Sequence, residues 1–306
     1  MAPVNETGKA RTFGSGRFVL ELDGKQAGFL KSIDGGGVTA EVVREAPGPD
    51  HLIRKHLGNV KYEDLVIEAD LSLDENFYAW IADSWKGKYQ RKDVSVYTLD
   101  ANNNVKRLDE YYNALITEVT IPAMDAASKE AARMTVKISP EYTRHKKGSG
   151  KMGKLPGIGK QKLWTTSNFR LNIGDLDCSR VSRVEPLVVK QSLSRDEVGG
   201  QRDYQLEPTS LEFPNLMITL AETSSQTWVD WHEDFVIKGK NGADQEKNGS
   251  LVFLAADQKT ELAQLSFFNL GIFKLTPDKV EAGGEKIRRL KAEMYCEEIE
   301  FKYEGL

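Results

Sequence analysis

The chain contains an internal repeat, and this repeat constrains its fold more than any single motif does. The stretch FVLELDG from Phe18 matches FRLNIGD from Phe169, and the stretch from Lys61 to Asp83 matches Glu212 to Asp234, both at a spacing of 151 residues. Later matches pair Val94 with Leu251 at 157 residues and Tyr112-Asn113 with Phe268-Asn269 at 156 residues. An insertion between Lys238 and Gly249 accounts for the change in spacing. We interpret this pattern as a tandem duplication of one domain.

The residue pattern in each copy predicts strands with one solvent-exposed face. Apolar residues recur at every second position, which is the side-chain period of a strand. In the first copy they are Phe18, Leu20 and Leu22, then Leu65, Ile67, Ala69 and Leu71, then Met134, Val136 and Ile138; in the second they are Leu216, Ile218, Leu220, then Leu290, Ala292 and Met294. We expect a mainly β fold with two tandem domains, at residues 1–145 and 163–306, joined by a linker at 146–162.

One helix per copy is predicted between the strands. Large apolar residues follow helical spacing at Phe77, Trp80, Ile81 and Trp85, and again at Trp228, Trp231 and Phe235. Asp74 and Ser225 stand where a side-chain oxygen would accept the first free amide hydrogens. Trp80 and Trp231 are expected to be core residues that close one end of a small barrel, and a binding role is the alternative.

The segment GSGKMGKLPGIGK, from Gly148 to Lys160, resembles a phosphate-binding loop. That loop needs Ser or Thr after its GxxxxGK pattern to hold magnesium, and Leu155 stands there instead. The segment from 146 to 162 holds six lysines and no acidic residue. A flexible solvated linker is the first interpretation. A basic strap that binds an acidic surface of a neighbour is the second, and contact with nucleic acid is a third.

Composition and residue spacing favour a non-enzymatic protein without cofactor or metal. The formal net charge of −4 argues against a protein that coats nucleic acid, and Cys178 and Cys296 have no metal or redox spacing. The histidines show no ligand spacing; they are His51, His56, His145 and His232. Three further stretches are expected to form turns: Asp34–Gly37 and the hairpin tips at Asp100–Asn104 and Asp257–Thr260. Asp83 and Asp234 are expected at caps or turns. The tip at Asp100 lacks the spacing to a Glu that a calcium loop needs.

The order of elements resembles the inner tail-tube proteins of contractile phage tails and of extracellular contractile injection systems. The matching stretches are a Pro- and Gly-rich loop at Pro47–Pro49 leading to GNVKYEDLVI, the helix around Trp80-Ile81 with Asp83, the stretch RKDVSVYTLD, and SKEAARMTVKIS. The resemblance implies a β-barrel or sandwich domain with a flanking helix, and rings of six such domains that stack into a hollow tube inside a sheath. The strands of neighbouring domains would pair edge to edge around the lumen.

This chain carries two such domains, so three chains would supply six positions as a pseudo-hexamer. The resemblance then implies self-association into stacked rings, contacts with sheath and baseplate proteins, and possible cargo in the lumen. A specialised ring near the baseplate or tube end is a variant of the same hypothesis. No secretory signal or long apolar run occurs, so we expect cytoplasmic assembly followed by incorporation into a phage-tail-like particle. The alternative is a soluble two-domain β-sandwich module that binds glycan or protein.

Overall fold

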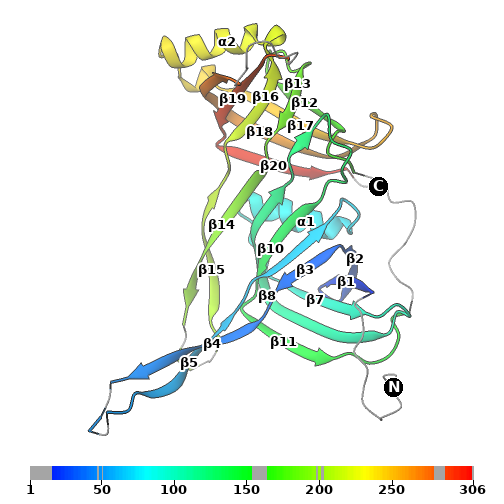
Figure 1. The fold of residues 1–306 in the computed structure, drawn as a ribbon, viewed down its shortest axis with the longest axis vertical. Coiled ribbons are helices and arrows are strands. Elements are labelled where there is room, and N and C mark those ends of the chain that lie inside the picture. The colour runs from blue at the N-terminus through cyan, green and yellow to red at the C-terminus, as the bar shows by residue number, and fades with distance from the viewer. Residues whose placement is uncertain are drawn as a thin grey trace.

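The computed structural model describes residues 16–46, 48–49, 51–153, 164–197, 199–200, 203–278 and 287–304. The protein is mainly β, and its two large sheets follow one another along the long axis of the molecule (Figure 1). One α-helix accompanies each sheet. The predicted fold class is therefore confirmed.

The first sheet has ten strands, in the order β2-β1-β7-β8-β10-β6-β3, with β11 and β14 paired to β8 and β15 paired to β14. It curls toward a barrel, because β2 at one end contacts β6 near the other. The strands from the first half of the chain are β1 (Arg17–Leu22), β2 (Lys25–Leu30), β3 (Ser32–Gly35), β6 (Leu65–Ala69), β7 (Lys92–Leu99), β8 (Val105–Ile121), β10 (Met134–Ser139) and β11 (Tyr142–Lys147).

The second sheet has eight strands and repeats this order, as β12-β17-β18-β19-β16-β13-β9 with β20 paired to β18. Its strands are β9 (Met124–Asp125), β12 (Phe169–Ile173), β13 (Val181–Val184), β16 (Leu216–Ala221), β17 (Lys247–Leu254), β18 (Glu261–Pro277), β19 (Arg289–Tyr295) and β20 (Glu298–Tyr303). β2 has no counterpart in this sheet, because the described chain between β12 and β13 forms no strand.

The strand pairings correct one of the predicted spacings. Val94 pairs with Tyr111 in the first sheet and Gly249 pairs with Phe267 in the second, so Val94 corresponds to Gly249 at 155 residues rather than to Leu251 at 157. A slip of two residues keeps every side chain on the same face, which is why the sequence pattern did not reveal it. The match of Asn113 with Asn269 holds, and both residues adopt a left-handed conformation.

Each half also forms a long β-hairpin. Arm 1 consists of β4 (Val38–Glu45) and β5 (Arg54–Tyr62), and it projects from the body as a separate two-stranded sheet (Figure 1). Arm 2 consists of β14 (Leu187–Asp196) and β15 (Gln205–Glu212), and it lies along the first sheet. The chain bends into arm 1 at Gly35 and Gly36, whose φ angles of 74° and 73° are costly for other residues. The predicted bend at Asp34–Gly37 is thus present between β3 and β4.

The helices are α1 (Glu75–Trp85) and α2 (Gln226–His232), the latter continued by a π-helical turn at Glu233–Ile237. Trp80, Trp228 and Trp231 are buried, as predicted. The Nε1 of Trp80 donates to the carbonyl of Gln90 at 2.8 Å, and the Nε1 of Trp231 donates to that of Gln245 at 3.2 Å. The two tryptophans therefore make equivalent hydrogen bonds in the two halves.

The two helix starts differ. The Asp74 carboxylate accepts the Asn76 amide hydrogen at 3.0 Å, which confirms the predicted N-cap. The prediction for Ser225 is wrong, because its hydroxyl donates to the Glu222 carbonyl at 2.7 Å. A 3₁₀ turn at Glu222–Ser224 leads directly into α2 and already places Ser225 in a helical conformation.

The basic segment begins as part of the first sheet rather than as a linker. Lys146 and Lys147 end β11, and the next residues follow the turn between β7 and β8. There the Val105 amide donates to the Gly150 carbonyl at 3.0 Å, and the Met152 amide donates to the Asn103 carbonyl at 3.0 Å. The sequence prediction of a linker from residue 146 is corrected for residues 146–153, while 154–163 lie outside the described residues.

Candidate assembly interface

The two sheets are connected by strands that cross from one half of the chain to the other. β8 and β9 pair with β14 and β13 in one continuous antiparallel register, in which Ile121 faces Leu187 and Met124 faces Val184. These four side chains are buried. We call this edge-to-edge contact, with the arm and helix contacts described next, the within-chain joint.

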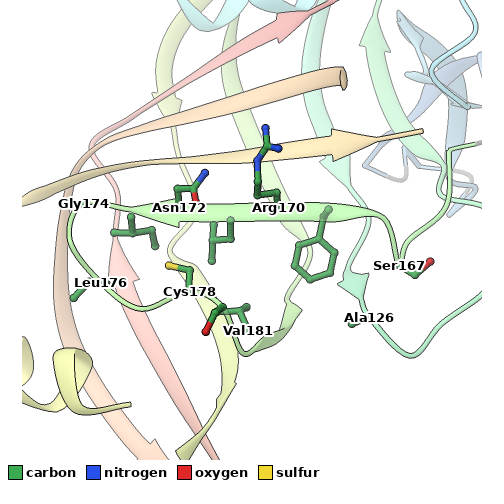
Figure 2. A pocket seen from close by; sticks show the side chains of 12 residues that line it. Ala126, Ser167, Arg170, Asn172, Gly174, Leu176, Cys178 and Val181 are labelled. Carbon is green, nitrogen blue, oxygen red and sulfur yellow. The ribbon is translucent and has the colours of Figure 1, made fainter. Parts of the chain in front are cut away.

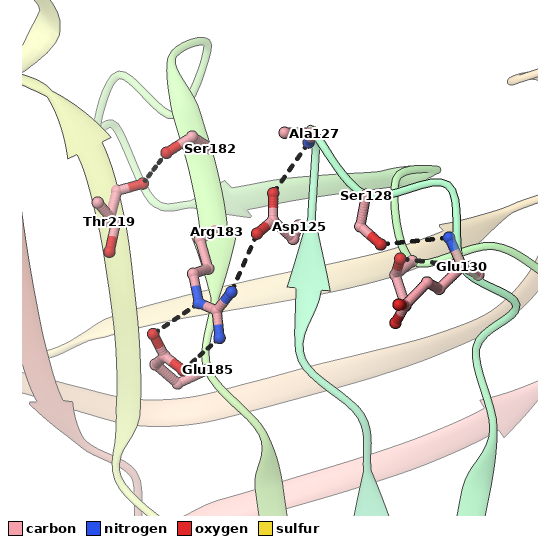
Figure 3. Close-up of polar contacts among 9 residues, drawn as sticks. Asp125, Ala127, Ser128, Glu130, Ser182, Arg183, Glu185 and Thr219 are labelled. Atoms are coloured by element: carbon pink, nitrogen blue, oxygen red, sulfur yellow. Dashed lines mark hydrogen bonds and ion pairs between the residues drawn. The ribbon is translucent and has the colours of Figure 1, made fainter. Parts of the chain in front are cut away.

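An ion-pair network covers the end of the paired strands. The guanidinium of Arg183 donates to Asp125 at 2.9 Å across the joint and to Glu185 at 2.8 Å within its own half (Figure 3). These groups are partly exposed, so their contribution to stability is small. Their positions instead specify the register, because a shift by one residue would separate Arg183 from Asp125.

Arm 2 is anchored on the first half by Arg91. Its guanidinium donates to the Glu207 carboxylate at 2.8 Å and pairs with Glu141 at 3.3 Å. Glu141 in turn accepts the Leu206 amide hydrogen at 3.1 Å. Because Glu141 is buried, this cation neutralises a charge that would be costly alone.

An apolar cluster lies beside this anchor. It consists of Tyr62 and Leu115 from the first half and Tyr204 and Leu206 from arm 2. The Tyr204 hydroxyl donates to the Tyr62 carbonyl at 3.3 Å, and the two ring centroids are 5.9 Å apart. Arm 2 is therefore held by burial as well as by charge.

The third contact of the within-chain joint places α1 against β20. The rings of Tyr78 and Tyr303 stack with centroids 4.2 Å apart, and Trp85 meets Phe301 edge-on at 5.9 Å. The Lys86 ammonium pairs with Glu300 at 2.9 Å. Thus the first half contributes the end of β8, the helix α1 and the Arg91 anchor, while the second half contributes arm 2 and β20.

Each contact surface of the within-chain joint has a counterpart on the other half of the chain, and there the counterpart is exposed. At spacings of 151 and 156 residues, arm 1 corresponds to arm 2 and the end of β18 corresponds to the end of β8. Val189 in arm 2 is 2% exposed, whereas its counterpart Val38 is 46% exposed. Within the described residues, β18 pairs only with β17, β19 and β20, so its end has an unpaired edge where β8 has β14.

The second helix, α2, also carries exposed counterparts of contact residues in the within-chain joint. At a spacing of 151 residues, Val229, Val236 and Ile237 correspond to Tyr78, Trp85 and Lys86, the residues of α1 that meet β20. Ile237 is 72% exposed. Apart from Ile287, the exposed large apolar residues of the described chain lie on arm 1 or its tip, on α2 with its π-helical turn, or on β18: Val38, Val42, Val43, Leu52, Ile53, Leu57, Val229, Val236, Ile237 and Phe273. Such concentration marks interaction surfaces.

A cavity of about 400 Å³ lies beside β12, where the second sheet lacks a counterpart of β2 (Figure 2). Leu176, Cys178 and Val181 face it, whereas Arg170 and Asn172 point to the other side of the strand. Burial raises the pKa of the Cys178 thiol, which lowers its nucleophilicity at neutral pH. The Cys178 thiol is therefore not an activated nucleophile.

The other polar residues that the sequence singled out make structural contacts. The Asp100 carboxylate accepts hydrogen bonds from the side-chain amide of Asn104 at 2.9 Å and from the backbone amides of Asn104 and Asn102, and these bonds lower its pKa. Asp257 accepts the Thr260 amide at the corresponding tip. His145 lies 2.6 Å from Asp109. Among the described residues, no group of His, Cys, Asp or Glu is arranged to hold a metal, and no helix is long and apolar enough to span a membrane.

Comparison with known proteins assigns the first of the two sheets to a family. Residues 14–144 match the family described as T4-like virus tail tube protein gp19. The first half of this chain belongs to the tail tube protein family. The matched residues include the end of β8 and α1, which take part in the within-chain joint, and arm 1, which corresponds to arm 2 of the second half.

Several solved structures resemble this chain over 44 to 50% of its length. They include the anti-feeding prophage tube-terminating cap, at 17% identity over 47% of this chain and 96% of that chain, with a TM-score of 0.40. A sheath–tube complex of the contractile injection system PVC has 16% identity over 44% and 92%, with a TM-score of 0.38. Hcp1 from Flavobacterium johnsoniae has 17% identity over 44% and 93%, with a TM-score of 0.26. No curated protein matches the chain significantly.

Proposed function

We propose that this chain is a non-enzymatic ring protein of a phage-tail-like contractile particle, produced by tandem duplication of a tail tube domain. Three copies supply six domains that close around a hollow lumen, and the rings stack into a tube or into its terminal part. A specialised ring near the baseplate or the tube end is the variant that the divergent second half favours. Assembly takes place in the cytoplasm, and the ring then contacts sheath and baseplate proteins.

The observation that carries the proposal is the pair of uncovered surfaces at opposite ends of the chain. The within-chain joint is head-to-tail, since it uses different surfaces of its two halves. The chain presents the same two kinds of surface again, the end of β18 with α2 on the second half and arm 1 with β11 on the first. A head-to-tail contact repeated between chains closes a ring when its rotation divides a full turn.

The within-chain joint predicts the register of the joint between chains. Val119 faces Val189 within the chain, so Leu275 of one chain should face Val38 of the next. Lys274 should face Thr39 on the same basis. This pairing would cover the exposed Val38 and satisfy the unpaired backbone groups of the β18 edge.

Disulfide trapping tests the proposal directly. Facing residues of paired strands have Cα atoms about 4.5 to 5.5 Å apart, within the range of a disulfide. Val38→Cys with Leu275→Cys should give closed, covalently linked trimers on oxidation. Val38→Cys with Lys274→Cys is the control, because these side chains would point to opposite faces. Monomers that never cross-link, and that appear as compact single particles by negative-stain microscopy, would contradict the ring and favour the binding-module alternative.

A further inference from the structure

The two joints of the ring differ in the charges that anchor the arm; this inference rests on the proposed ring. The tryptophan anchors align Gln90 with Gln245, so the next residues, Arg91 and Glu246, also correspond. The cation that holds arm 2 in the first half is therefore an acid in the second half. Glu141, the buried partner of Arg91, corresponds to Glu297.

Glu141 and Glu297 accept the same hydrogen bond, although Glu141 is buried beneath arm 2 and Glu297 is exposed. Asn113 donates to Glu141 at 2.7 Å, and its counterpart Asn269 donates to Glu297 at 2.7 Å. The second half thus keeps the acid of the anchor while replacing its cation. Two neighbouring glutamates take the place of an Arg–Glu pair.

These glutamates lack a compensating cation in the described part of the chain, where neither forms an ion pair with Lys or Arg. Glu246 instead accepts a hydrogen bond from the Tyr295 hydroxyl at 2.6 Å. Burial, together with the charges of Glu246 and Glu297, raises the pKa of Tyr295 to about 12. The site is therefore suited to receive positive charge from outside the chain.

In arm 1 the charge of the corresponding anchor residues is also reversed. β5 and β15 have the same bulge at a spacing of 151 residues, which aligns Leu206 with Lys55 and Glu207 with His56. The acid that arm 2 presents to Arg91 is thus a histidine in arm 1, preceded by a lysine. Both Lys55 and His56 are exposed.

We propose that Lys55 and His56 of one chain bind Glu246 and Glu297 of the neighbouring chain, as Glu207 binds Arg91 within each chain. The partner is a second copy of this protein, and the between-chain joint is a polarity-reversed form of the within-chain joint. Lys55 takes the place of Leu206, and its aliphatic stem can pack as that leucine does while its ammonium reaches the carboxylates.

The reversal makes the two joints non-interchangeable. If arm 2 docked on a second half, Glu207 would approach Glu246, and Lys190 would face Lys274 across the strands. If arm 1 docked on a first half, Lys55 and His56 would approach Arg91. Like charges placed opposite each other are destabilising, so each arm has only one compatible site. Arm exchange between chains, a hazard of any duplicated domain, is thereby suppressed.

Charge-reversal variants test this inference. Glu246→Arg and His56→Glu should each raise the concentration needed for half-assembly at least about tenfold, and the double variant should recover most of that loss. Glu246→Gln keeps an acceptor for Tyr295 while removing the charge, and should weaken assembly less than Glu246→Arg. Glu261→Arg, the same charge change at the opposite end of β18, is the matched control; it removes a partly exposed ion pair with Arg170 in the same half and should leave assembly unchanged.

The outcomes separate this inference from the ring itself. If the unmodified protein forms no trimer in native mass spectrometry, the ring fails. If it forms trimers whose assembly is unaffected by Glu246→Arg and His56→Glu, or whose losses are not recovered in the double variant, the ring stands and the reversed anchor is wrong. Circular dichroism of each variant monomer identifies a loss that is due to misfolding.

Discussion

Arm 1 and arm 2 are hairpins of corresponding sequence position with opposite surroundings. Arm 2 lies on the first sheet, held by Arg91 and by an apolar cluster, whereas arm 1 extends from the body with its valines exposed. The bulge that the two arms share shows that each is formed by its own strand pairing. Its docking depends on which surface lies beside it. The single chain thus contains one completed joint, and we propose that its uncovered surfaces form the two halves of a second one.

The largest effect on assembly should come from the uncovered helix. Val236→Asp combined with Ile237→Asp would place two charges where Trp85 and Lys86 of α1 meet β20. We expect loss of trimers at concentrations where the unmodified protein is fully assembled, since burying an unpaired charge is costly. Analytical ultracentrifugation measures this loss of trimers. Normal trimers of the α2 variant would exclude α2 from the joint.

The buried tryptophans of the two helices, Trp80 and Trp231, should contribute different amounts to the free energy of unfolding. Trp80→Ala should reduce the free energy of unfolding by about 3 to 5 kcal/mol, through lost burial and a residual cavity. Trp231→Ala should cost somewhat less, because Trp231 is 8% exposed against 1% for Trp80. Urea denaturation of the monomer gives both values. A loss below about 1 kcal/mol for Trp80→Ala would mean that the helix does not close the barrel.

The anchor of arm 2 should have a smaller, local effect. Arg91→Ala leaves Glu141 buried without its cation, so we expect arm 2 to be destabilised by about 1 to 3 kcal/mol. Hydrogen exchange at the Leu206 amide reports this loss of protection. The corresponding Lys55 amide of arm 1 should be protected only in the trimer, and equal protection in monomer and trimer would contradict the proposed docking of arm 1.

The smallest effect should come from the basic segment. Replacing the lysines that follow β11 (Lys151, Lys154, Lys160 and Lys162) with serine should leave assembly and its salt dependence unchanged if this part of the segment serves only as a connection. A strap bound to an acidic neighbour should instead lose stability that falls with ionic strength. Light scattering at low and high salt distinguishes the two hypotheses.

The sequence predicted the repeated elements well because each is determined locally. The alternating strands, the helices around Trp80 and Trp231 and the cap at Asp74 depend on neighbouring residues alone. The predicted Ser225 cap is wrong because a 3₁₀ turn before α2 changes the backbone conformation of Ser225. The spacing of Val94 to Gly249 was missed because a shift of two residues preserves the strand pattern.

The joint itself was not predictable from periodicity. Pairing of β8 with β14 joins residues 118–121 to 187–190, and no local signal marks which strand will cross to the other half. One signal was present in the sequence: at the repeat spacing, Arg91 and Glu207 change to Glu246 and His56 together. It becomes interpretable only when the structure shows that Arg91 and Glu207 touch.

Native mass spectrometry of the full-length chain tests the central claim most directly, because stoichiometry follows from two unlike joints alternating around a ring of six domains. The account predicts a closed trimer with a mass of three times 34.3 kDa, or stacks of such trimers. A closed ring of six full-length chains, which would contain twelve domains, would contradict it.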